Sequence, residues 1–548
     1  MRTYATVYFV FCSFLFLFSL SFLFRSILPF IAPTINEFDI LVVSPESLAF
    51  YMSPHRLTTL RVYKVPDDIL ISILAYLDPP SLWRACKAFR RIYVLVMEYQ
   101  FLRYKFELAA AGMKDGPASR TRSPINFRLQ LLLAYRKDWL KLSWSHESKM
   151  TIQTPSLINV SGGFIHFIRD HGMYSTLELA ELPSCTKSLT PAQTRHMKFH
   201  TSAIESASVD QSQLLIVTGH VFAHNGQICV QLNFRDLWKF TKHPRAPDAA
   251  YEVAAQAATS VYRMTISICG SKLSVSIQFS GGKVKHLIMN WHTFDAQWFD
   301  DRDILFLDES YLLGINKRSR VPFLTLYSIS KMTSVTILRE FELPEPWAHS
   351  HISFCPNAST KSDFSTSSGT IFYAAPETRI IVLSAKSTDR NSPLNLLFVK
   401  ESYFRFPSRK DPFEIPWKNW GRYCLVKEIP GNPLTIRGPH VVGTKVLYID
   451  ASVRASSSGR SGHAKLYMID FSSFTEAGDS TRGWTSIGPR AGLVPFETSR
   501  SIPSSTVGSL AIEEMRVTED NIVLFLEERQ GYRLANILSI GIPQSVRY

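Results

Sequence analysis

The sequence of 548 residues has only seven cysteines, and no two of them form a Cys-x-x-Cys pair. They are Cys12, Cys86, Cys185, Cys229, Cys269, Cys355 and Cys424. A disulfide framework would use an even set of cysteines, and a zinc ribbon would use closely spaced pairs. We therefore expect reduced thiols, as in a cytoplasmic or nuclear protein.

Catalytic motifs are also missing. The sequence has no P-loop, no dinucleotide-binding glycine fingerprint, no Gly-x-Ser-x-Gly and no His-Glu-x-x-His. His349, His351 and Cys355 lie close together in "WAHSHISFC", but zinc would need a fourth ligand that no neighbouring motif supplies. The acidic segment "FDDRD" (299–303) is interpreted as a turn between strands. The sequence predicts neither an enzyme nor a cofactor or metal site.

The charge of the chain is positive but dispersed. Sixty basic and 46 acidic residues give a formal net charge of +14, and the basic residues are not interleaved with aromatic residues. This pattern is typical of a solvated basic surface and does not favour a nucleic-acid partner. An acidic or phosphorylated target segment is the alternative that the charge leaves open.

The N-terminal segment 4–24 contains 21 residues without a charge, which is long enough to cross a bilayer. Two interpretations stay open. Residues 1–51 are either a hydrophobic leader with a membrane anchor, or the product of a misassigned start that precedes Met52. A membrane is expected as a partner only if segment 4–24 belongs to the mature protein.

The segment "VPDDILISILAYLDPPSLWRACKAFRRI" (65–92) predicts two short amphipathic helices separated by a double proline. The apolar residues of the first helix recur at the 3.6-residue period. Asp67 and Asp68 complement the positive end of that helix, and Asp78-Pro79-Pro80 ends it. Ser81 is expected to cap a second helix that continues to Val96, and a third apolar run covers 101–113. These helices are either a cap packed on the next domain or a partner-docking unit.

These residues resemble the F-box, with its Leu-Pro start, its paired aliphatic residues and its proline turn. Val65, Ala88-Phe89 and Ile92 depart from the usual pattern. The continuation over 114–144, and later stretches such as "IMNWHTF" and "IPWKNWG", resemble F-box proteins of mushroom-forming fungi. The resemblance implies docking to a Skp-type adaptor and, through it, to a cullin–RING ubiquitin ligase. The adaptor-facing residues that it implies are Pro66, Ile69, Leu70, Ile73, Leu74, Leu77, Pro80, Leu82 and Trp83.

The remaining sequence repeats a tight turn followed by an apolar strand, which is typical of β-hairpins. Seven such turns are marked by Gly162, Asp210, Gly270, Asp308, Glu377, Gly443 and Glu519. They predict an irregular β-propeller of about seven blades, with a pair of long β-sandwiches as the alternative. No Trp-Asp pair occurs, so WD repeats are not predicted.

The predicted architecture is multidomain α+β, with a small helical domain before a large all-β domain. Its parts are the leader (1–51), the F-box helices (52–113), a basic linker with a helix (114–150) and a target-recruiting propeller (151–548). The predicted function is that of a substrate-recognition adaptor of an SCF-type ubiquitin ligase. The rival is a membrane-anchored or secretory propeller enzyme or receptor, which glycosylation at Asn159 or Asn357 would favour.

Overall fold

The computed structural model describes residues 66–116, 123–153, 157–224, 227–255, 261–318, 321–358, 369–387, 389, 392–405, 412–430, 432–451, 464–472, 484–486, 495–507 and 510–542. The leader (1–51), including segment 4–24, lies outside these residues. Within the described part, Asp67 onward forms one compact unit.

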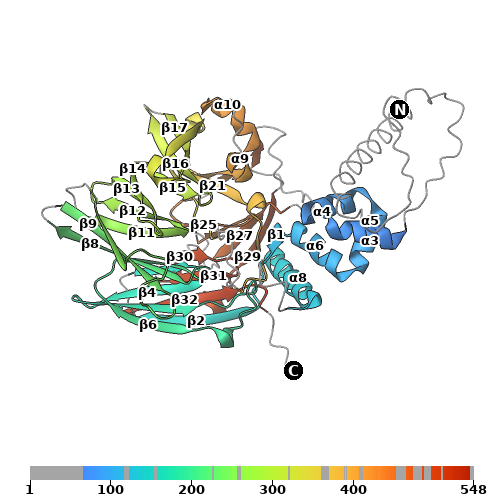
Figure 1. Ribbon diagram of the computed structural model, residues 1–548, viewed down its shortest axis with the longest axis horizontal. Helices are drawn as coiled ribbons and strands as arrows, with labels where there is room; N and C mark the ends of the chain where they lie inside the picture. Colours follow the sequence, from blue (N-terminus) through green and yellow to red (C-terminus); the bar gives the residue numbers. More distant parts are fainter. Residues whose placement is uncertain are drawn as a thin grey trace, which may run out of the picture. The chain divides into compact units, whose positions relative to one another are not determined.

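Four short helices form the helical unit, which we define as residues 67–110 and which is drawn in blue in Figure 1. They are α3 (Asp67–Tyr76), α4 (Pro79–Ala88), α5 (Arg90–Glu98) and α6 (Gln100–Ala110). The predicted second helix is divided in two, because Phe89 is extended (φ −134°, ψ 112°). The predicted cap at Ser81 is also corrected. Asp78 caps α4, since its side chain accepts a hydrogen bond from the Ser81 N–H at 2.9 Å.

Seven sheets form a β-propeller, as the spacing of the turns predicts. From the inner to the outer strand, blade 1 contains β3 (Leu157–Ser161), β4 (Phe164–Asp170), β5 (Ser175–Glu181) and β6 (His196–Thr201). Blade 2 contains β7 (Ser206–Asp210), β8 (Leu215–His224), β9 (Gln227–Asp236) and β10 (Ala250–Ala254). Blade 3 contains β11 (Val261–Cys269), β12 (Lys272–Phe279), β13 (Val284–Asn290) and β14 (Ala296–Phe299).

Blades 4 and 5 each carry a fifth strand. Blade 4 contains β15 (Asp303–Phe306), β16 (Tyr311–Arg318), β17 (Val321–Ser328), β18 (Thr336–Glu342) and the parallel edge strand β23 (Glu414–Ile415). Blade 5 contains β19 (His351–Phe354), β21 (Ile380–Lys386), β22 (Leu394–Lys400), β24 (Leu425–Ile429) and β28 (Trp484–Ser486). The short helices α9 (Ser402–Arg405) and α10 (Trp417–Trp420) lie in the connections between these strands.

The propeller is closed by strands from the two ends of the described chain. Blade 6 contains β25 (Ile436–Val442), β26 (Lys445–Asp450), β27 (Lys465–Asp470) and β29 (Phe496–Ser501), and α11 (Ser504–Val507) follows it. Blade 7 contains β30 (Ile512–Val517), β31 (Asn521–Leu526), β32 (Tyr532–Ser539) and β2 (His146–Gln153). β2 precedes all the other blade strands in sequence, yet it is the outer strand of the last blade (Figure 1). Hence the propeller begins at His146, five residues before the predicted boundary.

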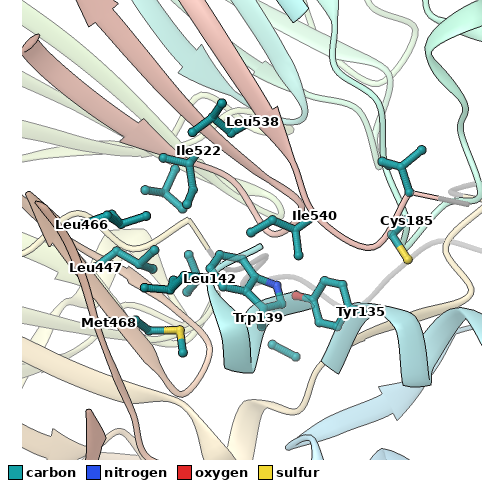
Figure 2. Close-up of a cluster of buried hydrophobic side chains, with 14 of the residues drawn as sticks. Tyr135, Trp139, Leu142, Cys185, Leu447, Leu466, Met468, Ile522, Leu538 and Ile540 are labelled. Atoms are coloured by element: carbon teal, nitrogen blue, oxygen red, sulfur yellow. The ribbon is translucent and has the colours of Figure 1, made fainter. Parts of the chain in front are cut away.

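Helix α8 (Ile125–Lys141) connects the helical unit to the propeller. It contributes the buried side chains of Tyr135 and Trp139 to a core that also includes Leu447, Leu466 and Leu538 of blades 6 and 7 (Figure 2). The Arg136 guanidinium pairs with Glu107 of α6. A second connection is β1 (Met113–Asp115), which pairs antiparallel with β20 (Phe372–Ala374).

Candidate functional site

The first candidate site is the surface of α3 and α4. Lys105 of α6 donates hydrogen bonds to the carbonyl oxygens of Ala75 (2.5 Å) and Leu77 (2.7 Å), and so satisfies carbonyl groups at the end of α3. An exposed ion pair between Asp67 and Arg91 joins the start of α3 to α5. These contacts attach the start of α3 to α5 and its end to α6.

The helical unit has its own small core. Its buried side chains are Leu74, Leu82, Cys86, Ile92, Val96, Leu102 and Phe106. Ile71 packs against the edge of this core, although it is not among the predicted docking residues. The core thus covers only part of the apolar surface of α3.

The uncovered part of α3 is an apolar stripe formed by Ile69, Ile73 and Tyr76. Their i, i+4, i+7 spacing places them on one side of the helix. Ile69 is 49% exposed, Tyr76 is 81% exposed, and Ile73 is half-buried. A stripe of this kind on a helix is a feature that helix-in-groove partners recognise.

The structure corrects the set of predicted docking residues. Leu74 (2% exposed) and Leu82 (0%) lie inside the helical core, so they support the unit and present no surface to a partner in this conformation. Pro66, Ile69 and Pro80 are exposed. Leu70, Ile73, Leu77 and Trp83 are half-buried, and Lys87 lies over the Trp83 ring. For these seven accessible residues, contact with an adaptor stays a prediction.

The second candidate site is a cavity of about 460 Å³ in the centre of the propeller. Residues from the first strand of every blade line it, mostly near the carboxyl ends of those strands. The seven turns predicted from the sequence each lie between the first two paired strands of one blade, and three of their landmarks, Gly162, Asp210 and Glu519, line the cavity.

A buried carboxylate holds one loop in the wall of this cavity. Asp520 accepts hydrogen bonds from the Ser184 hydroxyl (2.5 Å), the Thr186 hydroxyl (2.8 Å) and the Thr186 N–H (3.1 Å). Burial raises the pKa of Asp520, and these hydrogen bonds oppose the shift. The loop that Asp520 holds places Lys187 in the wall, where its ammonium group donates to the Gln211 side-chain oxygen.

Two buried histidines connect neighbouring blades. The His166 Nε2 atom lies 2.8 Å from the Ala207 carbonyl oxygen, and the His286 Nε2 atom lies 3.1 Å from the Asp301 carbonyl oxygen. Burial lowers the pKa of each to about 4. His440, in the cavity wall, has its pKa lowered to about 3 by burial and by the nearby Arg516. All three rings are therefore neutral at pH 7.

The segment "FDDRD" connects β14 to β15, as predicted, and two of its carboxyl groups also make buried contacts. Asp301 is buried and accepts a hydrogen bond from the Tyr327 hydroxyl at 3.1 Å. Asp303 lines the cavity and accepts from the Phe354 N–H at 2.8 Å. Burial raises the pKa of both carboxyl groups to about 6. The Asp303 side chain joins blades 4 and 5, and the Asp301 residue contacts blade 4 through its carboxyl group and blade 3 through its backbone carbonyl.

Sequence reasoning missed Lys187, Thr370 and Arg516, which all line the cavity. Single polar residues in unrelated loops and strands give no motif that could have identified them. Within the described residues, no group of three or more metal-ligating side chains occurs, and no helix is long and apolar enough to cross a membrane. No two of the six cysteines in the described part of the chain form a disulfide bond.

The chain was compared with protein-family models, curated proteins and solved structures. No protein-family model matches it, and no curated protein does. Among solved structures, the WD40 domain of Toxoplasma gondii coronin aligns with 74% of this chain and 88% of its own, with 10% identity and a TM-score of 0.36. The propeller domain of the trilobed protease from Pyrococcus furiosus aligns with 68% and 91% of the two chains, with 10% identity and a TM-score of 0.35.

Proposed function

We propose that this chain is the substrate-recognition adaptor of an SCF-type ubiquitin ligase. The helical unit docks a Skp-type adaptor, and the propeller binds the target protein. Ubiquitin transfer is carried out by the cullin–RING ligase, which gains from holding the target close to the reacting enzyme. Under this proposal the chain itself performs no catalysis and works in the cytoplasm or nucleus.

The observation that supports docking is the apolar stripe of Ile69, Ile73 and Tyr76. A soluble helix normally turns its apolar residues inward, and the core residue Leu74 shows that α3 does so on its other side. The residues left outside are large, and Tyr76 is almost fully accessible. Aromatic and aliphatic anchors of this size carry most of the energy when a partner buries them.

The rival function, a secretory propeller, is less well supported. Its two candidate glycosylation sites, Asn159 and Asn357, both line the central cavity, and Asn159 lies within strand β3. A glycan needs an acceptor asparagine in an accessible surface loop. Mapping of glycans on the protein from its native source would revive this alternative if either asparagine carried one.

The test is co-purification of the tagged full chain with a Skp-type adaptor. We expect Ile69→Glu combined with Tyr76→Glu to abolish co-purification, because two charges would enter the apolar contact. Gln100→Glu on α6 is the matched control, since it adds a charge at an exposed position of the same unit. Equal recovery of the adaptor with the double variant and the control would contradict the proposal, as would its absence from the wild-type sample.

A further inference from the structure

The last turn of α3 is held by a side chain from another helix. The final carbonyl groups of an α-helix have no partner inside the helix, and basic side chains near the end of a helix often bind them. α3 has no basic residue in its own last turn, and Pro79 and Pro80 follow shortly after its end. The donors for these carbonyl groups therefore come from elsewhere in the helical unit.

Lys105 of α6 supplies these donors. Its ammonium group donates to the carbonyl oxygen of Ala75 at 2.5 Å and to that of Leu77 at 2.7 Å, which lie 30 and 28 residues earlier in the chain. Both hydrogen bonds are charge-assisted and are therefore stronger than bonds between neutral groups. Burial lowers the pKa of Lys105, while the charge of Asp78 opposes the shift. The ammonium group thus works in partly buried surroundings, where water competes less for the two carbonyl groups.

The two acceptor groups of Lys105 lie on either side of Tyr76 in the sequence. Tyr76 is the last residue of α3 and, at 81% exposed, the most exposed member of the apolar stripe. Helix ends fray, so a side chain on the last residue is the one least well placed by its own helix. Lys105 holds the backbone directly before and directly after this residue. The hydrogen bonds of Lys105 consequently act where the stripe has the least support from α3 itself.

We infer that Lys105 is a positioning residue for adaptor docking, which keeps Tyr76 on the same side of α3 as Ile69 and Ile73. This inference rests on the proposed function, because the stripe of α3 would be the docking surface. The measured affinity of a site falls in proportion to the fraction of molecules in which the site is formed. An anchor that is ordered before binding also loses less conformational entropy when a partner covers it. Both effects make the affinity for the adaptor depend on Lys105.

The experiment measures the Kd of the full chain for a Skp-type adaptor by isothermal titration calorimetry. Lys105→Met keeps most of the aliphatic stem but removes both donors, and we expect it to raise the Kd about tenfold. Lys105→Arg keeps a charged donor and should recover most of the affinity. Lys137→Met, at an exposed position on α8, removes the same charge and should bind like the wild-type chain.

A double-mutant cycle separates positioning from a general loss of stability. Tyr76→Ala removes the anchor that Lys105 is inferred to hold. In the Tyr76→Ala background, Lys105→Met should raise the Kd less than about threefold, because no anchor is left to be positioned. A purely structural role would give the same factor in both backgrounds, and that result would overturn the inference. An unchanged Kd for Lys105→Met in the otherwise wild-type chain would overturn it as well.

Hydrogen exchange reports on the end of α3 without the adaptor. We expect Lys105→Met to speed amide exchange in peptides that cover residues 72–78, while exchange in the propeller blades stays as in the wild-type chain. Circular dichroism checks that every variant is folded. Unchanged exchange in residues 72–78 would show that Lys105 does not hold this part of the helix, and the inference would fall.

Failure of this inference can be told apart from failure of the proposed function. A wild-type chain that binds no adaptor would refute the ligase role, and the docking role of Lys105 would be lost with it. A wild-type chain that binds the adaptor with the same Kd as Lys105→Met would refute the positioning inference alone. The exchange measurement then shows whether Lys105 holds the end of α3 without any consequence for docking.

Discussion

The hydroxyl group of Tyr135, on α8, donates a hydrogen bond to the backbone carbonyl oxygen of Glu519, 384 residues later in the chain, at 2.9 Å. Glu519 lies in the first turn of blade 7, directly before the Asp520 that holds the Lys187 loop. The helix that follows the helical unit is thus bonded to the turn that shapes the central cavity. Tyr135 and Trp139 lie next to each other in the same buried cluster (Figure 2).

Tyr135→Phe should therefore lower the free energy of unfolding by about 1–2 kcal/mol, because the carbonyl group of Glu519 loses its donor. The aromatic ring and its packing against Trp139 are retained. Urea denaturation of the full chain measures the change. Tyr99→Phe, at a residue that is 41% exposed, is the control and should stay within about 0.5 kcal/mol of wild type. Identical unfolding curves for all three proteins would show that this hydrogen bond contributes nothing.

Truncation of a side chain should cost much more stability on the buried side of α3 than on its exposed side. Leu74→Ala should destabilise the helical unit by about 2–5 kcal/mol, because it opens a cavity in a small core. Ile69→Ala should cost less than about 0.5 kcal/mol, since the side chain is half exposed. Hydrogen exchange of the amides in α3–α6 reports the local stability. Similar losses of protection in both variants would mean that α3 is buried differently from this structure.

Closure of the propeller should depend on the inward residue of β2. Ile152 is fully buried in a cluster with Ile165 and Val523, so it joins blades 1 and 7. Ile152→Ala should lower the free energy of unfolding by about 2–5 kcal/mol. Thr151→Ala, at the exposed neighbouring position, should change it by less than about 0.5 kcal/mol. Chemical denaturation measures the free energy of unfolding of both variants. Equal midpoints for the two would argue against this register of β2.

The buried histidines should make the protein less stable in acid. The pKa of His286 is lowered from 6.5 to about 4 by burial, so between these values the unfolded chain binds a proton that the folded chain does not. Its contribution is complete above pH 6.5 and is lost as the pH falls toward 4, at about 1.4 kcal/mol per pH unit. Asp301 acts in the opposite direction, because its pKa is raised to about 6 and the folded chain binds its proton first.

A difference measurement isolates the histidine. Between pH 7 and pH 4.5, His286→Gln should lose about 2–3 kcal/mol less stability than the wild-type chain does. Urea midpoints at both pH values give the comparison. His351→Gln, at an exposed position on β19, is the control and should follow the wild-type chain. If His286→Gln also follows it, the ring of His286 is not held neutral by burial.

Local patterns predicted a propeller of about seven blades, and the structure has seven. In each blade the first turn lies between two apolar strands. Two of the residues that mark these turns, Gly162 and Gly443, have positive φ values of 56° and 59°. Such turns are recognisable because their backbone geometry favours glycine or short polar side chains. The start of α3 was predictable for a similar reason, since acidic residues at a helix N-terminus act through local electrostatics.

Other features needed contacts between distant residues. Nothing near Phe89 breaks a helix in the manner of proline or glycine, yet the chain is extended there, between α4 and α5. The pairing of β2 with β32 joins residues almost 400 positions apart, and no local pattern specifies it. The resemblance also carried Leu74 of α3 and Leu82 of α4 into the set of docking residues, whereas the packing of the four helices buries both side chains.

The amino-acid sequence alone determined the order of the parts, namely a short helical unit followed by seven turn-and-strand repeats, because these depend on interactions between near neighbours. The tertiary structure decided which apolar residues of α3 stay accessible, how the ring of blades closes, and which residues of the seven blades line the central cavity. Those properties arise from contacts that form only when the blades pack together. Local sequence patterns do not specify contacts between residues that are distant in the chain.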